Sequence, residues 1–169
     1  MFNHGNALFG VNIYTIAFWN LYIAAGKLIV PTSAKAEAGF GIEVEPVVVA
    51  SLSDSAGSSD AIAQAFKQGN PSVPTPDWKT RLPPVVLRHA GVKSWSAFVS
   101  KAKGWAVKKA PGSYLVVPLK KVRLEGRVGL QEDRESAVAV TDHGDVSAVS
   151  VKIFQVISRS LLSERQISL

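Results

Sequence analysis

Side chains able to carry out chemistry are few and scattered along the 169-residue chain. The three histidines, His4, His89 and His143, lie too far apart in the sequence for the spacing of a metal site. No cysteine is present, which excludes disulfides, thiolate zinc sites and cysteine nucleophiles. The sequence also lacks a GxxxxGKS/T phosphate loop, a GxGxxG fingerprint and a GxSxG elbow. We therefore expect no metal, no other cofactor, no catalytic residue and no small-molecule substrate.

Two acidic groupings remain as candidates for acid–base chemistry. Glu43 and Glu45 alternate along a predicted strand, so they point to one face and could share a proton. We favour the alternative interpretation, a solvated outer face. His143 lies between Asp142 and Asp145, an arrangement more typical of a turn than of a catalytic group. These groupings do not select a reaction, so we interpret the chain as a binding protein and not an enzyme.

The positive charge of the chain allows a second interpretation. Nineteen Lys and Arg against thirteen Asp and Glu give a formal net charge of +6. Trp105 lies among Lys103, Lys108 and Lys109, and an aromatic ring between basic side chains can stack on single-stranded nucleic acid. The simpler alternative is a solvated basic surface with Trp105 in the core. Binding of single-stranded nucleic acid is therefore kept as the second functional hypothesis.

The N-terminal segment 7–26 is uncharged and long enough to span a bilayer. Polar Asn12, Thr15 and Asn20 interrupt it, and no positive charge precedes it to act as a signal-peptide n-region. We interpret it as buried strands, with a membrane segment as the alternative. Together with the absence of cysteine, this favours a cytoplasmic protein.

Hydrophobic periodicity predicts the secondary structure elements. Strict alternation over 39–51 predicts a strand with Phe40, Ile42 and Val44 buried, Glu43 and Glu45 exposed, and Pro46 at an edge or bulge. We expect the first helix to be capped by Ser58 or Ser59 and ended by Gly69, and a short helix to be capped by Ser94 and ended by Gly104. Further predictions are a hairpin of 105–109 with 113–119, an exposed loop at 122–135, a strand at 136–141, a turn at 142–145 and a final helix at 146–163.

This order of elements predicts an α+β fold in a single domain. We expect mostly antiparallel sheet with two main amphipathic helices and a short helix. The elements also suggest two strands-then-helix halves, about 1–70 and 90–169, joined by a Pro-rich connector over 71–84.

Several stretches of the sequence resemble one known family. They are EAGFGIEVEPVVV at 37–49, PTPDWK at 74–79, GVKSWSAFVSKAK at 91–103 and the C-terminal strand and helix that begin SAVAVTDHGD at 136. Together, over roughly residues 36–163, they resemble immunity proteins of the contact-dependent growth inhibition (CdiI) type. The resemblance implies a 1:1 complex with the C-terminal toxin domain of a neighbouring cell's large surface protein. It also implies cytoplasmic neutralisation of that toxin, which in such systems is often a nuclease, by blocking its active site or substrate access.

The resemblance carries no general binding motif, so the contact residues are predicted from charge. Nuclease toxins tend to be basic because they bind phosphate backbones, and an acidic patch would complement them. Because this chain is itself basic, either the toxin surface is acidic or the acidic residues of the chain gather locally. The acidic residues of two neighbouring loops could make such a patch. The predicted toxin-binding residues are Glu132, Asp133, Arg134, Glu135, Asp142 and Asp145.

Overall fold

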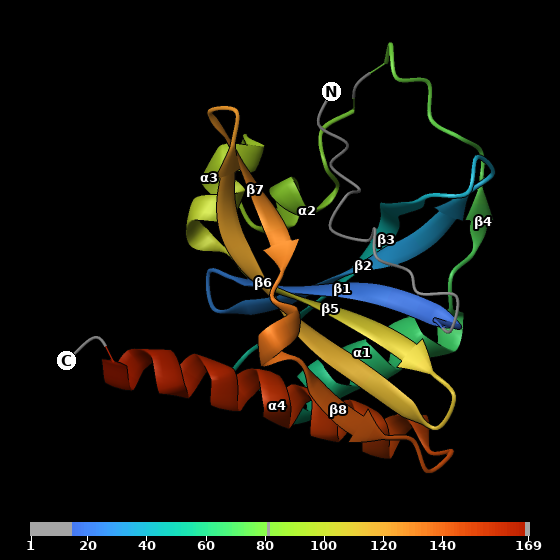
Figure 1. Ribbon diagram of the computed structural model, residues 1–169, viewed down its shortest axis with the longest axis vertical. Coiled ribbons are helices and arrows are strands. Elements are labelled where there is room, and N and C mark those ends of the chain that lie inside the picture. The colour runs from blue at the N-terminus through green and yellow to red at the C-terminus, as the bar shows by residue number, and fades with distance from the viewer. Residues whose placement is uncertain (1–14, 81, 168–169) are drawn as a thin grey trace.

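The computed structural model describes residues 15–80 and 82–167, and in them an eight-stranded sheet forms the centre of the molecule (Figure 1). The strand order is β3-β2-β1-β5-β6-β7, with β4 added to β2 and β8 added to β6. Every pairing is antiparallel except that of β2 with β4, which confirms the α+β prediction. The strands are β1 (Ala17–Ala24), β2 (Lys27–Ala36), β3 (Gly41–Ser51), β4 (Ser72–Val73), β5 (Lys103–Ala110), β6 (Ser113–Leu124), β7 (Arg127–Glu132) and β8 (Val138–Thr141).

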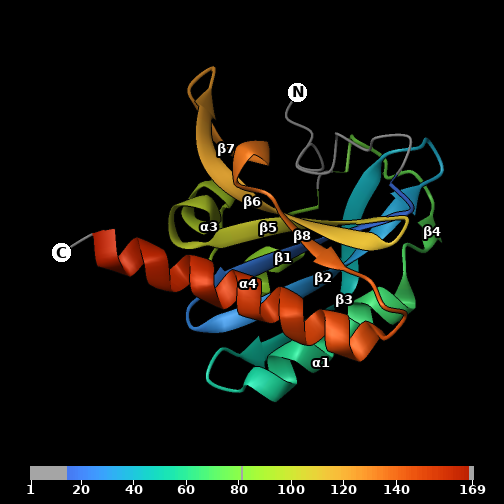
Figure 2. The same cartoon turned by 60° about the horizontal axis from the view of Figure 1, so that its bottom comes forward.

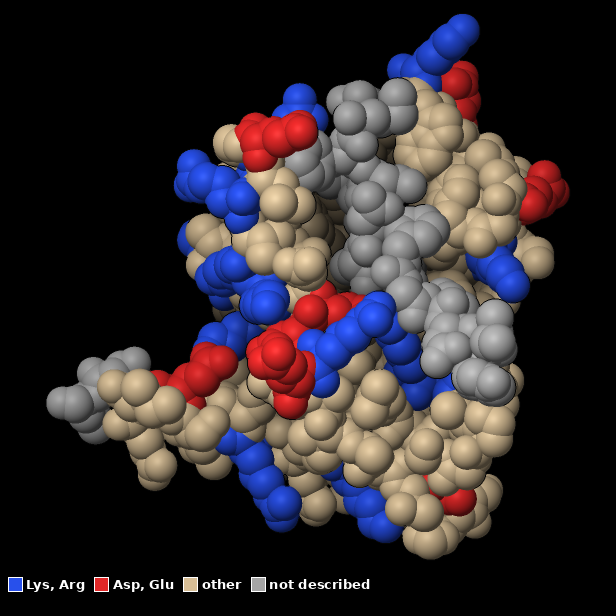
Figure 3. Space-filling view, viewed as in Figure 1, with Lys and Arg blue, Asp and Glu red and all other residues tan. Residues whose placement is uncertain are grey.

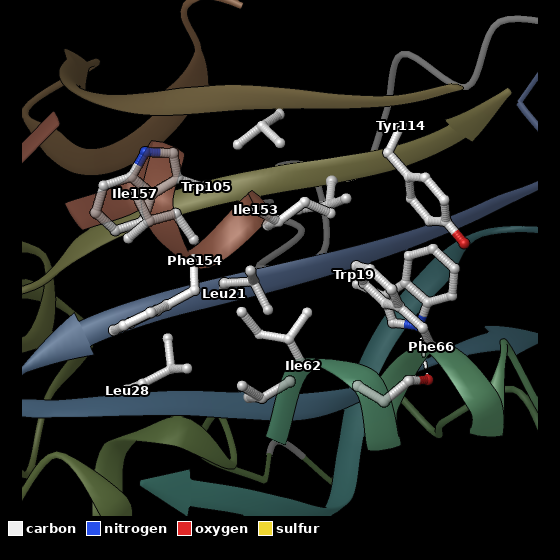
Figure 4. Packing of buried hydrophobic residues seen from close by; sticks show 14 of the residues in the cluster. Trp19, Leu21, Leu28, Ile62, Phe66, Trp105, Tyr114, Ile153, Phe154 and Ile157 are labelled. Atoms are coloured by element: carbon white, nitrogen blue, oxygen red, sulfur yellow. Dashed lines mark hydrogen bonds between the residues drawn. The ribbon is translucent and has the colours of Figure 1, made fainter. Parts of the chain in front are cut away.

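Helices cover both faces of this sheet (Figures 1 and 2). On one face, Ile62 and Phe66 of the first helix and Ile153 of the last join a large buried cluster (Figure 4). On the other, Leu87 and Phe98 of the two short helices join a second cluster. The helices are α1 (Ser55–Gln68), α2 (Val86–His89), α3 (Trp95–Lys101) and α4 (Val146–Ile167), with a 3-10 turn η2 (Arg134–Ser136) before β8.

The apolar N-terminal segment supplies the central strand of the sheet. β1 lies between β2 and β5, and all its residues after Ala17 are buried. Its β-branched and aromatic residues fit a strand that is covered on both faces. The strand interpretation is therefore confirmed for residues 17–24, while residues 7–14 lie outside the described part of the chain.

Helix α4 is long and apolar enough, by length and composition, to cross a membrane. Its apolar stripe, however, is already used in the core, since Val149, Ile153 and Ile157 are buried against the sheet. Their spacing of four residues places them on one helix face, as expected for a helix that packs on a core.

Strand β3 differs from its predicted pattern. It is an edge strand, and its pairing with β2 shifts register between Pro31 and Thr32, opposite Pro46, which confirms the expected edge or bulge position. Ile42 and Val44 are only half-buried, and Phe40 precedes the strand. Glu43 turns inward, so the prediction that both glutamates are exposed is wrong for Glu43. The inward position of Glu43 depends on the register in which β3 pairs with β2. Period-2 alternation within β3 alone cannot provide that register.

Two helix boundaries also differ. Asp54, not Ser58 or Ser59, caps α1 by accepting a hydrogen bond from the Gly57 amide, and both serines are buried within the helix. Gly69 ends α1, as predicted.

The predicted start of α3 is confirmed, but its predicted end is not. Ser94 caps the helix by accepting from the Ala97 amide. The helix ends at Lys101, and Gly104 lies in β5. A side chain at Gly104 would meet Tyr22 and Leu119 at about 3 Å, so this glycine permits close packing and does not terminate the helix.

The prediction of an exposed loop at 122–135 is wrong, because the end of β6 and strand β7 form a hairpin there. Strand β6 continues to Leu124, turns at Glu125 and Gly126, and returns as β7. Both turn residues have positive φ, 50° and 75°, which suits a tight two-residue hairpin turn. The hairpin across Pro111 and Gly112, the strand near 136–141 and the long final helix are confirmed.

The two predicted halves form the two ends of a single sheet. Strands β1–β3 make up one end of the strand order and β5–β8 the other, and the pairing of β1 with β5 joins them. In each half a long helix follows the strands, and α1 and α4 contact each other. That the halves are related copies stays a prediction.

Candidate functional site

The predicted contact residues near 132–135 lie where the sheet divides. The first part of β6 pairs with β8, and from Leu119 onward β6 pairs with β7. The chain passes from one branch to the other through η2, and the Asp133 amide donates to the Pro118 carbonyl there at 2.8 Å. We call this region, residues 132–136 at the base of β7, the fork.

A buried ion pair holds the fork together. The Nζ of Lys108 lies 2.7 Å from Oε1 and 2.9 Å from Oε2 of Glu132. The two side chains are only 11% and 8% exposed. Arg134, which is mostly exposed, adds a contact from its Nε to Glu132 Oε2 at 3.2 Å. Glu132 is therefore an internal structural group, and a partner can reach the fork only through its neighbours.

Two of those neighbours face solvent. Arg134 and Glu135 are exposed, whereas Asp133 is half-buried and accepts a hydrogen bond from the Ser136 hydroxyl at 2.9 Å. Acidic side chains gather over the fork in the space-filling view (Figure 3). Asp133 and Glu135 therefore remain available as negative charges for a partner.

Asp142 and Asp145 lie elsewhere. Thr141 pairs with Ser113 at the start of β6, whereas Glu132 pairs with Leu119 six residues further along. At about 3.3 Å per residue, the two groups are roughly 20 Å apart along the strand. The expectation of a single acidic patch is therefore wrong, because β6 separates loops that are close in sequence.

Both of these aspartates have local roles. Asp142 lies 3.9 Å from the ammonium of Lys109. Asp145 precedes α4 and accepts hydrogen bonds from the Ser147 and Ala148 amides, as an N-capping residue does. His143, between them, is exposed in the turn. The structure therefore does not assemble these residues into an acid–base site.

The two glutamates of β3 have separate surroundings. Glu43 Oε1 accepts hydrogen bonds from Tyr22 Oη at 2.5 Å and Asn20 Nδ2 at 2.8 Å. Glu45 instead contacts Arg88 and His89 of α2. A shared-proton pair would need the two carboxyl groups together, so the arrangement does not support one. Among residues 15–80 and 82–167, no His, Asp and Glu cluster could hold a metal ion.

Burial raises the pKa of the Glu43 carboxyl, and the hydrogen bonds from Tyr22 and Asn20 oppose this rise. The folded state therefore holds the Glu43 proton more tightly than the unfolded state does. The resulting stabilisation is complete at acidic pH and is lost as the pH rises through the raised pKa. We expect Glu43→Gln, which stays neutral, to gain stability relative to wild type in urea unfolding as the pH rises above the ordinary carboxyl pKa, because only the wild type loses this stabilisation.

Glu45→Gln provides a matched control with the opposite sign. Burial alone would raise the Glu45 pKa, but the contacts from His89, the Val47 amide and Arg88 lower it overall. Its stabilisation is therefore present at neutral pH and lost as the pH falls. Parallel pH profiles for wild type and Glu43→Gln would contradict the assignment of Glu43 as the buried acid.

The proposed nucleic-acid site is not assembled either. Trp105 is 3% exposed and belongs to the buried cluster that includes Ile157 (Figure 4). Lys108 forms the buried ion pair described above. A ring that cannot reach solvent cannot stack on a base, so this hypothesis loses its main residue.

Comparison with known proteins adds a fold likeness. No protein-family model matches the chain, and no curated protein matches its sequence. A protein of unknown function from Neisseria meningitidis is similar over 85% of this chain and 95% of that one, with a TM-score of 0.55 and 12% identity. A chain of a CdiA-CT/CdiI toxin and immunity complex from Yersinia pseudotuberculosis is similar over 85% of this chain and 96% of its own length, with a TM-score of 0.56 and 11% identity. At these identities the likeness shows the fold.

The β6–β7 hairpin was not predicted from the sequence, which was interpreted as an exposed loop in this region. A signal was present, because Val122, Leu124, Val128 and Leu130 alternate with polar residues on both sides of Glu125-Gly126. Such alternation around a two-residue turn is typical of a hairpin.

Proposed function

We propose that this chain is an immunity protein that binds and neutralises the C-terminal toxin domain of a contact-dependent growth inhibition system. The observation that carries the proposal is the fold shared with a chain of a toxin and immunity complex, over nearly all of that chain. The resemblance of the segments between 36 and 163 points the same way. We place the protein in the cytoplasm, where it would meet an incoming toxin.

Neutralisation of this kind requires a rigid surface and no catalysis. The described residues supply such a surface, since both sheet faces are packed by helices and the fork is fixed by its ion pair. Bound in a 1:1 complex, the protein would cover the toxin's active site or block access of its substrate. A nuclease is the toxin class we propose, and Asp133 and Glu135 would face its basic surface.

A growth assay tests this proposal. Expression of the toxin domain encoded next to this chain should arrest growth, and co-expression of the chain should restore it. Asp133→Lys with Glu135→Lys should weaken protection, because reversed charges slow association. Glu37→Lys with Asp60→Lys makes the same charge change at exposed positions outside the fork and should protect like wild type. Failure of the wild-type chain to protect would contradict the proposed function.

A further inference from the structure

The unbalanced positive charge of the molecule is concentrated in one region. Figure 3 shows basic side chains over the β6–β7 hairpin and α3. Seven basic side chains belong to the hairpin and to the adjoining ends of α3, β5 and α4, against three acidic ones, Glu125, Glu132 and Glu164. This excess of four accounts for most of the net charge of +6. We call this set the basic arm: Lys101, Lys103, Lys120, Lys121, Arg123, Arg127 and Arg165.

Contacts within the basic arm hold positive charges close together. The Nζ of Lys121 donates to the Ser100 carbonyl at 2.8 Å, which ties the hairpin to α3. Lys103 contacts Glu164 near the end of α4. Burial lowers the pKa of Lys103, and the positive charges of Lys121 and Arg165 lower it further. The charges of Lys121 and Arg165, held this close to Lys103, create a positive potential that an anionic surface would relieve.

The hairpin that carries these charges is a preformed projection. Its pairing continues without interruption from Leu119 to Leu124, which lies opposite Arg127 beside the turn. Both views show it extending away from the sheet (Figures 1 and 2). Leu124 is 57% exposed near its tip. Because the strand that carries Leu124 is already paired, a partner that binds there has to order little backbone.

We propose that the basic arm is the docking element for the toxin, and that it takes an acidic protein surface with a shallow apolar pocket for Leu124. This inference rests on the proposed function. It differs from that proposal in the chemistry of recognition, because the toxin would present carboxylates to the arm. Arg123 suits them, since a guanidinium pairs with a carboxylate through two parallel hydrogen bonds.

A protein surface fits the arm better than a nucleic acid does. Single-strand binders place exposed aromatic rings along a basic groove. Of the tryptophans, Trp19 and Trp105 are buried and Trp78 packs on Phe40, beside the distant β2–β3 turn. Trp95 of α3 is half-buried, and its ring stacks on that of Phe98 and not toward an open groove. The arm is a projection and not a groove, and an apolar residue surrounded by charge is the arrangement common at protein interfaces.

The fork gives the same surface a direction. The arm is positive at the tip of β7, and Asp133 and Glu135 are negative near its base. Opposite charges at the two ends of one strand favour a single docking orientation, because the reversed one would place like charges together. The acidic fork and the basic arm would thus be the two ends of one interface.

Charge reversal on the arm tests the inference. The probe is the purified toxin domain encoded next to this chain, with binding followed by surface plasmon resonance at several salt concentrations. Lys120→Glu with Arg123→Glu should lower the association rate by about tenfold to a hundredfold and flatten or invert its salt dependence. Leu124→Ser should mainly raise the dissociation rate. Lys27→Glu with Lys67→Glu, the same charge change at exposed sites at the start of β2 and on α1, should bind within about twofold of wild type.

The possible failures can be told apart. If wild type binds the toxin and the arm variants, folded by circular dichroism, bind equally well, the arm is not the docking element while the proposed function stands. If wild type does not bind, the proposed function fails and the inference fails with it. Salt-dependent binding of wild type to an unstructured oligonucleotide or to anionic vesicles, lost in the arm variant while toxin binding is kept, would assign the arm to another anion and overturn the inference.

Discussion

Replacing Lys108 with methionine is expected to lower the free energy of unfolding by about 3–5 kcal/mol. The substitution keeps the apolar stem and removes the charge that compensates Glu132, whose side chain is 8% exposed. Arg134 reaches the same carboxylate only from the solvent side and cannot replace a buried ammonium. Urea unfolding of the wild type and the variant measures the loss directly.

Two controls separate the ion pair from general damage. The double variant Lys108→Met, Glu132→Met should recover most of the loss, because an apolar pair leaves no buried charge unpaired. Lys103→Met, which breaks the more exposed contact with Glu164, should cost at most about 1 kcal/mol. A loss below about 1 kcal/mol for Lys108→Met would show that water reaches the fork, and Glu132 would again be a candidate contact residue.

Trp19→Ala is expected to cost about 3–5 kcal/mol. The indole ring of Trp19 is 2% exposed, and its centroid lies 4.3 Å from that of Phe66 and 6.3 Å from that of Tyr114 (Figure 4). Its Nε1 donates to the Ala65 carbonyl at 3.0 Å, which links β1 to α1. Truncation would leave a cavity between the central strand and the helix.

Trp78→Ala is the matched control, with the same change at a residue that is 45% exposed. Its ring centroid lies 5.4 Å from that of Phe40. We expect a loss of no more than about 1 kcal/mol, since an exposed aromatic pair contributes little beyond its own contact. Equal losses for the two tryptophans would contradict the division between core and surface aromatic residues.

Elements with a strong local pattern could be predicted from the sequence. In α4, Val149, Ile153 and Ile157 repeat every four residues, and the turn at Pro111-Gly112 separates two clear apolar runs. The wrong predictions depend on partners distant in the sequence. Glu43 turns inward because its contacts come from Asn20 and Tyr22 on another strand.

The candidate site was harder to predict for the same reason. Lys108 looks like one of several surface lysines until β7 brings Glu132, 24 residues later, against it. Asp142 is ten residues from Glu132 in sequence, but the pairing of β6 places the two groups at separate positions along the sheet. The sequence therefore shows which residues are acidic. It does not show which of them are exposed and which lie close together, because strand pairing decides both.

The function we propose for this chain is neutralisation of a toxin by binding it. The most direct measurement is a titration of the purified chain into the toxin domain encoded beside it, with heat of binding and toxin activity followed together. We expect saturation at one equivalent, a dissociation constant of about a nanomolar or tighter, and loss of toxin activity in proportion to the complex formed. Undiminished toxin activity with excess chain, or no binding at micromolar concentrations, would contradict the proposed neutralisation.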